Sequence, residues 1–230
     1  MTKQLLITGA NRGIGLALTR LYCEAGWDVI ACCRAPEAAA HLMELLEEYE
    51  GLELFELDVT DFDAVSELAD ELESRPIDLL INNAGFYGPK GVEFGFTDPE
   101  SWHQVFTINC IAPMKLSEAF FPHLAKAKGV IANMSSKMGS MTDNTSGGAY
   151  LYRSSKAALN SVTRSLAIDL APAGIKVLAL HPGWVQTEMG GPNALIDTRT
   201  SAAGIKAVID NLDERTNGRL VDFSGQVIPW

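Results

Sequence analysis

Cysteine is scarce in this chain of 230 residues, which contains four of them. None belongs to a Cys-x-x-Cys pair and two are adjacent, at Cys23, Cys32, Cys33 and Cys110. This spacing excludes a disulfide framework and a zinc knuckle, and it fits a reducing cytosol. Histidine is equally scarce. We expect no metal site, because metal-ligand spacing is absent from His41, His103, His123 and His181.

Basic residues are few relative to acidic ones. The 18 Lys and Arg residues face 29 Asp and Glu residues, which gives a formal net charge of -11. An acidic surface repels nucleic acids and anionic membranes, so neither is expected as a partner. The composition favours a small soluble ligand.

Long hydrophobic runs are also lacking. After Met1-Thr2-Lys3 the first apolar run covers Leu5 to Ile7 and ends before Gly9. Such a run is too short for a signal-peptide core or a membrane span. We therefore expect a cytoplasmic protein.

Apolar residues are plentiful overall. With 47% hydrophobic and 20% charged positions, the chain can bury a sizeable core within the usual size of one α/β domain. We find no internal repeat, low-complexity tract or interdomain linker. The sequence predicts a single domain over residues 1–230.

Six short apolar runs are separated by helical stretches. They cover Leu5–Thr8, Val29–Cys33, Leu52–Leu57, Ile77–Ile81, Val130–Met134 and Lys176–Leu180. Continuous apolar character is typical of parallel strands covered by helices on both faces. Helix signals lie between them, with Gly26 after Gly13–Ala25, Thr60 as an N-cap for Thr60–Glu73, and Asp98-Pro99 before Glu100. The alternation predicts a doubly wound parallel sheet of the Rossmann type.

Three further segments complete the prediction of the fold. The loosely patterned stretch Gly190–Ser201 is expected to form a flap over the substrate. The acidic helix His41–Glu50 is interpreted as a solvated face. The long helix Glu100–Lys126, interrupted near Pro113, could pair with a symmetric copy in a homodimer or homotetramer, or pack on its own sheet.

A glycine-rich loop connects the first strand to the first helix. It contains Gly9, Gly13 and Gly15, together with Asn11, Arg12 and Ile14. Glycines allow a tight turn and close approach to a pyrophosphate, whose charge is favoured at a helix N-terminus. The spacing Gly-x-x-x-Gly-x-Gly differs from the usual Gly-x-Gly-x-x-Gly, and a plain turn is the alternative. The strand before the loop and the helix after it favour a dinucleotide site.

The end of the second predicted strand indicates which dinucleotide binds. An acidic residue there would bind the ribose hydroxyls of NAD, whereas an arginine accommodates the 2′-phosphate of NADP. This chain has Arg34, and Arg12 could add a second positive charge. The sequence thus predicts NADP(H). The alternative is that Arg34 is only a solvated loop residue and that the cofactor is NAD, which the nearby Glu37 would also allow.

Tyr152 and Lys156 are spaced to share one face of a helix. A nearby cation favours the phenolate, so we expect Lys156 to lower the pKa of Tyr152 toward the working pH. The phenol could then give or take a proton during hydride transfer. Tyr150 is the other nearby candidate for this proton-transfer role. The residue four positions after it is Ser154, not a lysine, so the spacing favours Tyr152.

The ordered set of motifs resembles the short-chain dehydrogenase/reductase family over essentially the whole chain. The matching segments are Thr8 to Gly15, Asn82-Asn83-Ala84-Gly85, Asn109, Ser136, Tyr152 with Lys156, and Pro182-Gly183. The segments around Asn133–Ser140, Asp143–Gly148 and His181–Met189 resemble the branch of C-factor-like proteins and carbonyl reductases. A polar insertion, Thr142–Gly148, lengthens the separation of Ser136 from Tyr152.

The resemblance implies a role for each matching residue. Tyr152 would be the general acid or base, Ser136 would hydrogen-bond the substrate oxygen, Lys156 would hold the nicotinamide ribose, and Asn109 would support the proton relay. Ser135 is the competing serine, and Gly139 three positions after Ser136 favours Ser136. Further cofactor contacts are implied for Asp58, Val59, Asn83, Ala84, Gly85, Pro182, Gly183, Val185 and Thr187.

The function that follows is hydride transfer between NADP(H) and a small carbonyl or alcohol. A regulatory or signalling protein that binds NAD(P)(H) with little turnover is the main rival, and an epimerase or dehydratase sharing the Tyr/Lys pair is a third candidate. Several apolar side chains near the strand ends could line a substrate pocket or serve ordinary packing: Phe86, Tyr87, Phe94, Met138, Met141, Trp184 and Met189.

Overall fold

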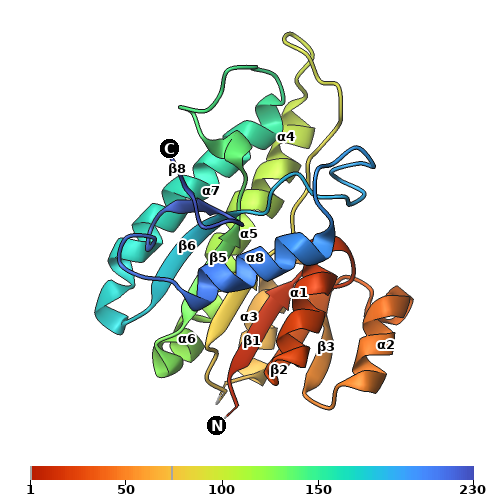
Figure 1. Ribbon diagram of the computed structural model, residues 1–230, viewed down its shortest axis with the longest axis vertical. Helices are drawn as coiled ribbons and strands as arrows, with labels where there is room; N and C mark the ends of the chain where they lie inside the picture. The colour runs from red at the N-terminus through yellow and green to blue at the C-terminus, as the bar shows by residue number, and fades with distance from the viewer. Residues whose placement is uncertain (1, 74) are drawn as a thin grey trace.

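The computed structural model describes residues 2–73 and 75–230. Its centre is an eight-stranded sheet with the order β3-β2-β1-β4-β5-β6-β7-β8 (Figure 1). All neighbouring strands are parallel except β7 and β8, which pair antiparallel. The strands are β1 Gln4–Thr8, β2 Asp28–Cys33, β3 Leu52–Glu56, β4 Leu79–Asn82, β5 Val130–Met134, β6 Lys176–His181, β7 Leu220–Asp222 and β8 Val227–Ile228. The strand order reverses between β1 and β4, which confirms the predicted doubly wound fold.

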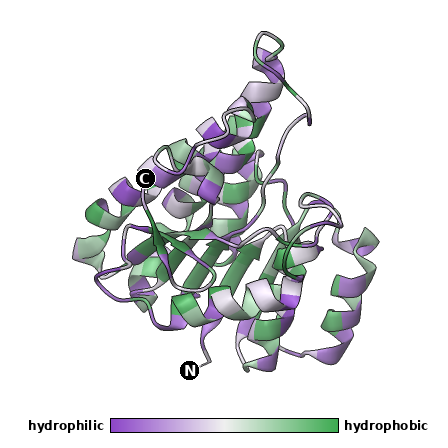
Figure 2. Ribbon diagram, turned by 45° about the horizontal axis from the view of Figure 1, so that its top comes forward, coloured by the Kyte–Doolittle hydropathy of each residue, from purple (hydrophilic) through white to green (hydrophobic). Residues whose placement is uncertain are grey.

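Helices cover both faces of this sheet. They are α1 Gly13–Glu24, α2 Ala40–Glu48, α3 Phe62–Glu71, α4 Pro99–Phe106, α5 Ala112–Ala119, α6 Phe121–Ala127, α7 Tyr150–Asp169 and α8 Thr198–Asp210. Helices α1, α2 and α8 contribute to one core, and α3, α5, α6 and α7 contribute to the other. Figure 2 shows the apolar strands between these helices, whose outward turns are largely polar.

Successive strand residues face opposite cores. On β1, Leu5 and Ile7 pack against the α1 side, whereas Leu6 packs against the α5 side, and all three are completely buried. Because side chains alternate along a strand, a sheet covered on both faces needs apolar residues at every position. This requirement accounts for the continuous apolar runs in the sequence.

Aspartates cap three of the helices. Asp98 accepts a hydrogen bond from the Ser101 N–H at the start of α4, and Asp197 does the same for Thr200 in α8. At α3 the cap is Asp61, which accepts from the Ala64 N–H. The predicted N-cap at Thr60 is therefore wrong by one residue, because the carboxylate of Asp61 reaches the free N–H.

Other predicted boundaries also shift. Strand β4 begins at Leu79 rather than Ile77, and the expected long helix after Asp98 is divided by a π-helical turn at Thr107–Ile111. Residues Thr198 to Ser201 of the expected flap form the first turn of α8, which leaves 190–197 as the loop. Asp197 is the reason, since its side chain starts the helix there. Strands β7 and β8 and helix α8 were absent from the sequence-based prediction.

Within the described residues, no helix combines the length and the apolar character that a membrane crossing requires. The four cysteines are buried and free.

Candidate active site

The loop between β1 and α1 requires glycine at two positions. Gly9 has a φ of +65°, which favours a residue without a Cβ. A Cβ on Gly15 would lie 2.2 Å from the Gly9 carbonyl oxygen, closer than atoms can approach. The loop is thus folded tightly on itself, as a phosphate-binding turn requires.

Asn83, the residue after strand β4, braces this loop. Its Nδ2 donates to the carbonyl oxygens of Thr8 and Gly9, at 2.9 and 3.0 Å. The Thr8 hydroxyl accepts from the N–H groups of Asn83 and Ala84, both at 3.1 Å. The side chain of Asn83 is therefore used to shape the glycine loop, and Thr8 is a partner that the sequence reasoning did not identify.

The N-terminus of α1 has no side-chain cap among the described residues. Arg12 occupies the N-cap position. Free N–H groups at a helix start bind phosphate groups well. Gly13 faces Thr187, whose Cγ2 would lie 3.3 Å from a Cβ at Gly13. The side chain of Arg12 forms an exposed ion pair with Glu188, across the same gap.

Arg34 follows β2 directly and is exposed. Its guanidinium forms no ion pair within the part of the chain that the structure describes, and its charge contributes to a lowered pKa of Asp58. The main cause of that shift is the hydrogen bond that Asp58 accepts from the Thr60 N–H, at 2.9 Å. Val59 is buried beside them. Arg34 is thus free to meet an anion at the edge of the cleft.

Tyr152 and Ser136 lie together at the carboxyl end of β5. Tyr152 is 9% exposed, and hydrogen bonding by the Ser136 side chain lowers the pKa of its phenol. The neighbouring Ser135 is turned away, because its hydroxyl donates to Asn160 at 2.6 Å. Of the two candidate serines, the structure therefore brings Ser136 to the tyrosine.

The pKa of Tyr152 is raised to about 12, which contradicts the expected lowering by Lys156. Burial is the largest cause, because the phenolate loses its hydration. The hydrogen bond from Ser136 opposes this effect, and Tyr87 adds to it. In the protein alone Tyr152 is consequently a neutral proton donor at neutral pH.

Lys156 is 3% exposed and lies next to Tyr152 on α7. Its Nζ donates to the Met134 carbonyl oxygen at 2.7 Å and lies 5.7 Å from the centre of the Tyr152 ring. Burial lowers the pKa of Lys156 to about 8. An ammonium has three donors, and one is accounted for here. The others fit the hydroxyls of a ribose at this position.

Gly85 keeps space open beside that ammonium. It is exposed, and a Cβ on it would come within 3.8 Å of Lys156 Nζ and 3.5 Å of Asn109 Oδ1. Asn109 itself is completely buried and is occupied by the segment after β4. Its Oδ1 accepts from the Phe86 N–H at 2.8 Å, and its Nδ2 donates to the Phe86 carbonyl at 2.7 Å and to Ser155 Oγ at 3.0 Å.

The segment after β6 forms another wall of the cleft. Gly183 has a φ of +89°, and a Cβ there would lie 2.7 Å from Ile196. Next to Pro182 and Gly183, Val185 is 4% exposed and bridges to Ile196. Thr187 accepts a hydrogen bond from the Gly190 N–H. The turn therefore places Thr187 over the glycine loop.

The sequence did not reveal the contacts of Thr8 with Asn83, of Ser155 with Asn109, or of Arg153 with Ser146 and Gly147 of the insertion. Thr8 and Ser155 stand inside the recognised motifs, so their motif positions were an available signal. No group of three or more His, Cys, Asp or Glu side chains arranged for a metal ion occurs in residues 2–73 and 75–230.

Fold and site together define a dinucleotide-binding α/β protein with a Ser, Tyr and Lys cluster at the carboxyl edge of its sheet. The family model for short chain dehydrogenase matches residues 3–195. This chain belongs to that family.

Similar proteins agree with the assignment. The C-signal protein of Myxococcus xanthus is 45% identical over 156 residues, which cover 67% of this chain and 93% of that protein. Among solved structures, the carbonyl reductase Sniffer of D. melanogaster is 35% identical, with a TM-score of 0.95 and full coverage of both chains. The NADPH-bound carbonyl reductase from chicken fatty liver is 35% identical, with a TM-score of 0.93, and the match covers 100% of this chain and 99% of that one.

Proposed function

We propose that this chain is an NADP(H)-dependent oxidoreductase that moves a hydride between nicotinamide and a small carbonyl or alcohol. The observation that carries the proposal is the meeting of Ser136, Tyr152 and Lys156 at one buried point beside an open dinucleotide loop. The similar structures named as carbonyl reductases support the substrate class. The buried free cysteines support a cytoplasmic location.

NADP(H) is the proposed cofactor because the charges of the cleft fit it. The uncapped N-terminus of α1 suits the pyrophosphate, and Arg34 suits the 2′-phosphate. One similar structure is named as NADPH-bound. When bound, the reduced nicotinamide would supply the hydride. Residues Asp58 and Val59 would flank the adenine.

Tyr152 acts as the general acid in reduction. Its raised pKa keeps the phenol protonated at neutral pH, so the proton is available when negative charge develops on the substrate oxygen. Ser136 donates a second hydrogen bond to that oxygen, and Lys156 holds the ribose hydroxyls with its free donors. Asn109 keeps the loop after β4 in place, and residues 190–197 cover the substrate side as a flap.

NADPH oxidation with a panel of apolar aldehydes, ketones and diketones tests this proposal. We expect turnover with at least one substrate class, and a loss of about 10²- to 10⁴-fold in Tyr152→Phe with unchanged NADPH affinity. Tyr150→Phe, which changes a more exposed phenol on the same helix, is the matched control and should remain active. Tight NADPH binding without turnover on any substrate would refute the oxidoreductase.

The second candidate is a regulatory protein that binds the cofactor with little turnover. The similarity to a protein named C-signal favours it. The buried, complete set of Asn109, Ser136, Tyr152 and Lys156 favours the enzyme, because cofactor binding alone has no chemical need for a protonated phenol. The same substrate panel separates the two candidates.

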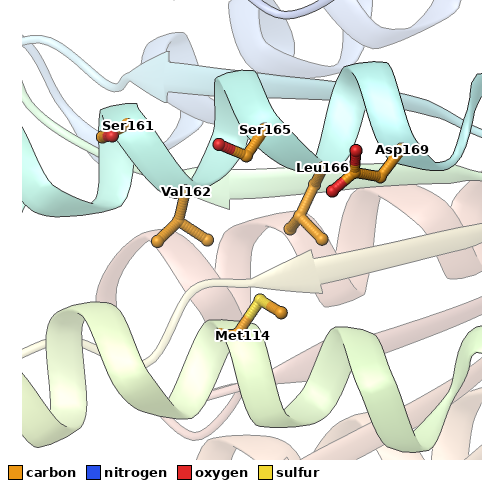
Figure 3. Close-up of a pocket in the computed structure, with 6 residues that line it drawn as sticks. All are labelled: Met114, Ser161, Val162, Ser165, Leu166 and Asp169. Carbon is orange, nitrogen blue, oxygen red and sulfur yellow. The ribbon is translucent and has the colours of Figure 1, made fainter.

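Self-association is proposed through the outer face of α5 and α7. A groove of about 290 Å³ lies there. Figure 3 shows Met114 on α5 facing Val162 and Leu166 on α7. Ile168 on α7 is 58% exposed beside it. A second copy of the chain would cover this face, whose lining also includes Ser161, Ser165 and Asp169, in a homodimer or homotetramer. Sedimentation of the wild type and Ile168→Glu tests this: an assembly that dissociates in the variant supports it, and a monomeric wild type refutes it.

A further inference from the structure

The ring of Tyr87 is stacked on the ring of Tyr152. Their centroids are 4.7 Å apart and the planes are inclined by 30°. Tyr87 comes from the segment after β4, 65 positions earlier in the chain than Tyr152. Neighbouring aromatic rings in offset geometry attract each other beyond the effect of buried area. The contact therefore restrains the phenol that the proposed reaction needs.

The backbone that carries Tyr87 is fixed from one side by Asn109. The carboxamide of Asn109 holds both the N–H and the carbonyl of Phe86, at 2.8 and 2.7 Å. The same Nδ2 donates to Ser155 Oγ, and Ser155 in turn donates to the Tyr152 carbonyl at 2.8 Å. One buried side chain thus ties the residue before Tyr87 to the helical turn of Tyr152.

The same backbone is fixed from the other side by Gly88. This glycine has a φ of +83°, a conformation that other residues rarely adopt. A Cβ on it would lie 2.8 Å from Val105 Cγ2 of α4. The chain therefore turns sharply against α4 immediately after Tyr87. With both neighbours held, the ring of Tyr87 has little freedom to leave Tyr152.

We infer that Tyr87 is a positioning residue for Tyr152. The ring of Tyr87 holds the ring of Tyr152, so that the Tyr152 hydroxyl stays beside Ser136. The inference rests on the proposed reductase function. The proton passes from Tyr152 to the substrate oxygen, and Tyr87 gains or loses no proton in the step. Tyr87 also contributes, after burial, to the raised pKa of Tyr152.

Two substitutions separate the ring from the hydroxyl. Tyr87→Ala removes the stack, and kcat should fall about 2- to 10-fold while KM for NADPH stays constant. Tyr87→Phe keeps the stack, so kcat should remain within about twofold of the wild type. Tyr150→Ala is the control, because Tyr150 lies on the same helix and is 37% exposed.

Measuring the effect of Tyr87→Ala both in the wild type and in Tyr152→Phe distinguishes positioning of Tyr152 from general stabilisation of the fold. Tyr87→Ala should have no further effect on the residual kcat of Tyr152→Phe if its ring acts only to place the Tyr152 hydroxyl. A kcat of Tyr87→Ala equal to the wild type, or an equal loss in both backgrounds, would overturn the inference.

A thermal measurement keeps the test independent of turnover. Tyr87→Ala should lower Tm by about 2 to 5 °C more in the wild type than in a Tyr152→Leu background, because the stack exists in the first and not in the second. Equal losses of Tm would refute the stack itself. If the protein is inactive on every substrate but still shows this difference in Tm loss, the proposed function is refuted and the contact between Tyr87 and Tyr152 is established.

Discussion

The charge of Lys156 titrates within the working pH range, since burial lowers its pKa to about 8. Below pH 8 the ammonium is present, and as the pH rises through 8 its attraction for the ribose and the phenol is lost. Tyr152 remains protonated over this range, because its pKa is raised to about 12. We therefore expect kcat/KM for carbonyl reduction to be level below pH 8 and to fall above it.

The variant Lys156→Arg tests whether Lys156 causes the fall of kcat/KM above pH 8. A guanidinium stays charged at all accessible pH values, so the falling limb should move upward by more than one pH unit. NADPH titration of the variant serves as the control for folding and cofactor binding. A limb that stays near pH 8 in Lys156→Arg would show that another group controls it.

Arg34 is expected to decide between NADPH and NADH. The 2′-phosphate carries close to two negative charges, and an arginine can meet it with two charge-assisted hydrogen bonds of roughly 1.5 to 3 kcal/mol each. Arg34→Asp removes one or both of these bonds, so it should weaken NADPH binding by about 10- to 10⁴-fold and leave NADH nearly unaffected. The ratio of kcat/KM for the two cofactors measures the effect. A wild type that prefers NADH, or a ratio that changes less than about threefold, would contradict the assignment.

The residue-scale prediction succeeded where the chemistry is local in sequence. Tyr152 and Lys156 are one helical turn apart, so their proximity follows from spacing alone. The direction of the tyrosine pKa was wrong because it depends on burial, which is created by segments far away in the chain. The stacking of Tyr87 was beyond prediction for the same reason.

At the scale of elements, Arg153 ties helix α7 to the polar insertion near the site. Its guanidinium donates to the carbonyls of Met138 and Gly147 and to the Ser146 hydroxyl. In Arg153→Met we expect a looser segment 138–148, a substrate KM raised about 3- to 10-fold, and an unchanged KM for NADPH.

Substrate and cofactor kinetics measured on the same preparation test this role of Arg153. The matched control is Arg164→Met, an exposed arginine on the same helix for which no hydrogen bond to this segment is described. An equal rise of both KM values would indicate general damage to the fold. If neither KM rises, the insertion does not contribute to substrate binding.

The elements themselves were predictable where their patterns are strong. Six strands were identified because each is a mostly apolar run next to a turn, although β3 is buried only at Leu52. Strands β7 and β8 were missed because they contain three and two residues, too few for a periodic signal. Helix α8 was missed because its N-terminal half, beginning Thr198-Arg199-Thr200, is polar and glycine interrupts it at Gly204.

At the scale of the whole molecule, the cleft collects its parts from distant stretches of chain. Parallel strands bring the carboxyl ends of β1, β2, β4 and β5 to one edge, so the glycine loop, Arg34, Gly85 and Ser136 gather there (Figure 1). A ligand that spans these loops links all of them at once. Binding should consequently stabilise the fold as a unit.

We expect NADPH to raise the Tm of the protein far more than NADH does. A ligand at 100 times its Kd stabilises the folded state by about 2.7 kcal/mol, which corresponds to roughly 5 to 10 °C for a chain of this size. NADH lacks the phosphate that Arg34 would bind, so its Kd should be higher and its shift smaller at the same concentration. In Arg34→Asp the NADPH shift should fall to the NADH level. Differential scanning fluorimetry at several cofactor concentrations measures these shifts, and identical wild-type curves for the two cofactors would refute a phosphate-specific site.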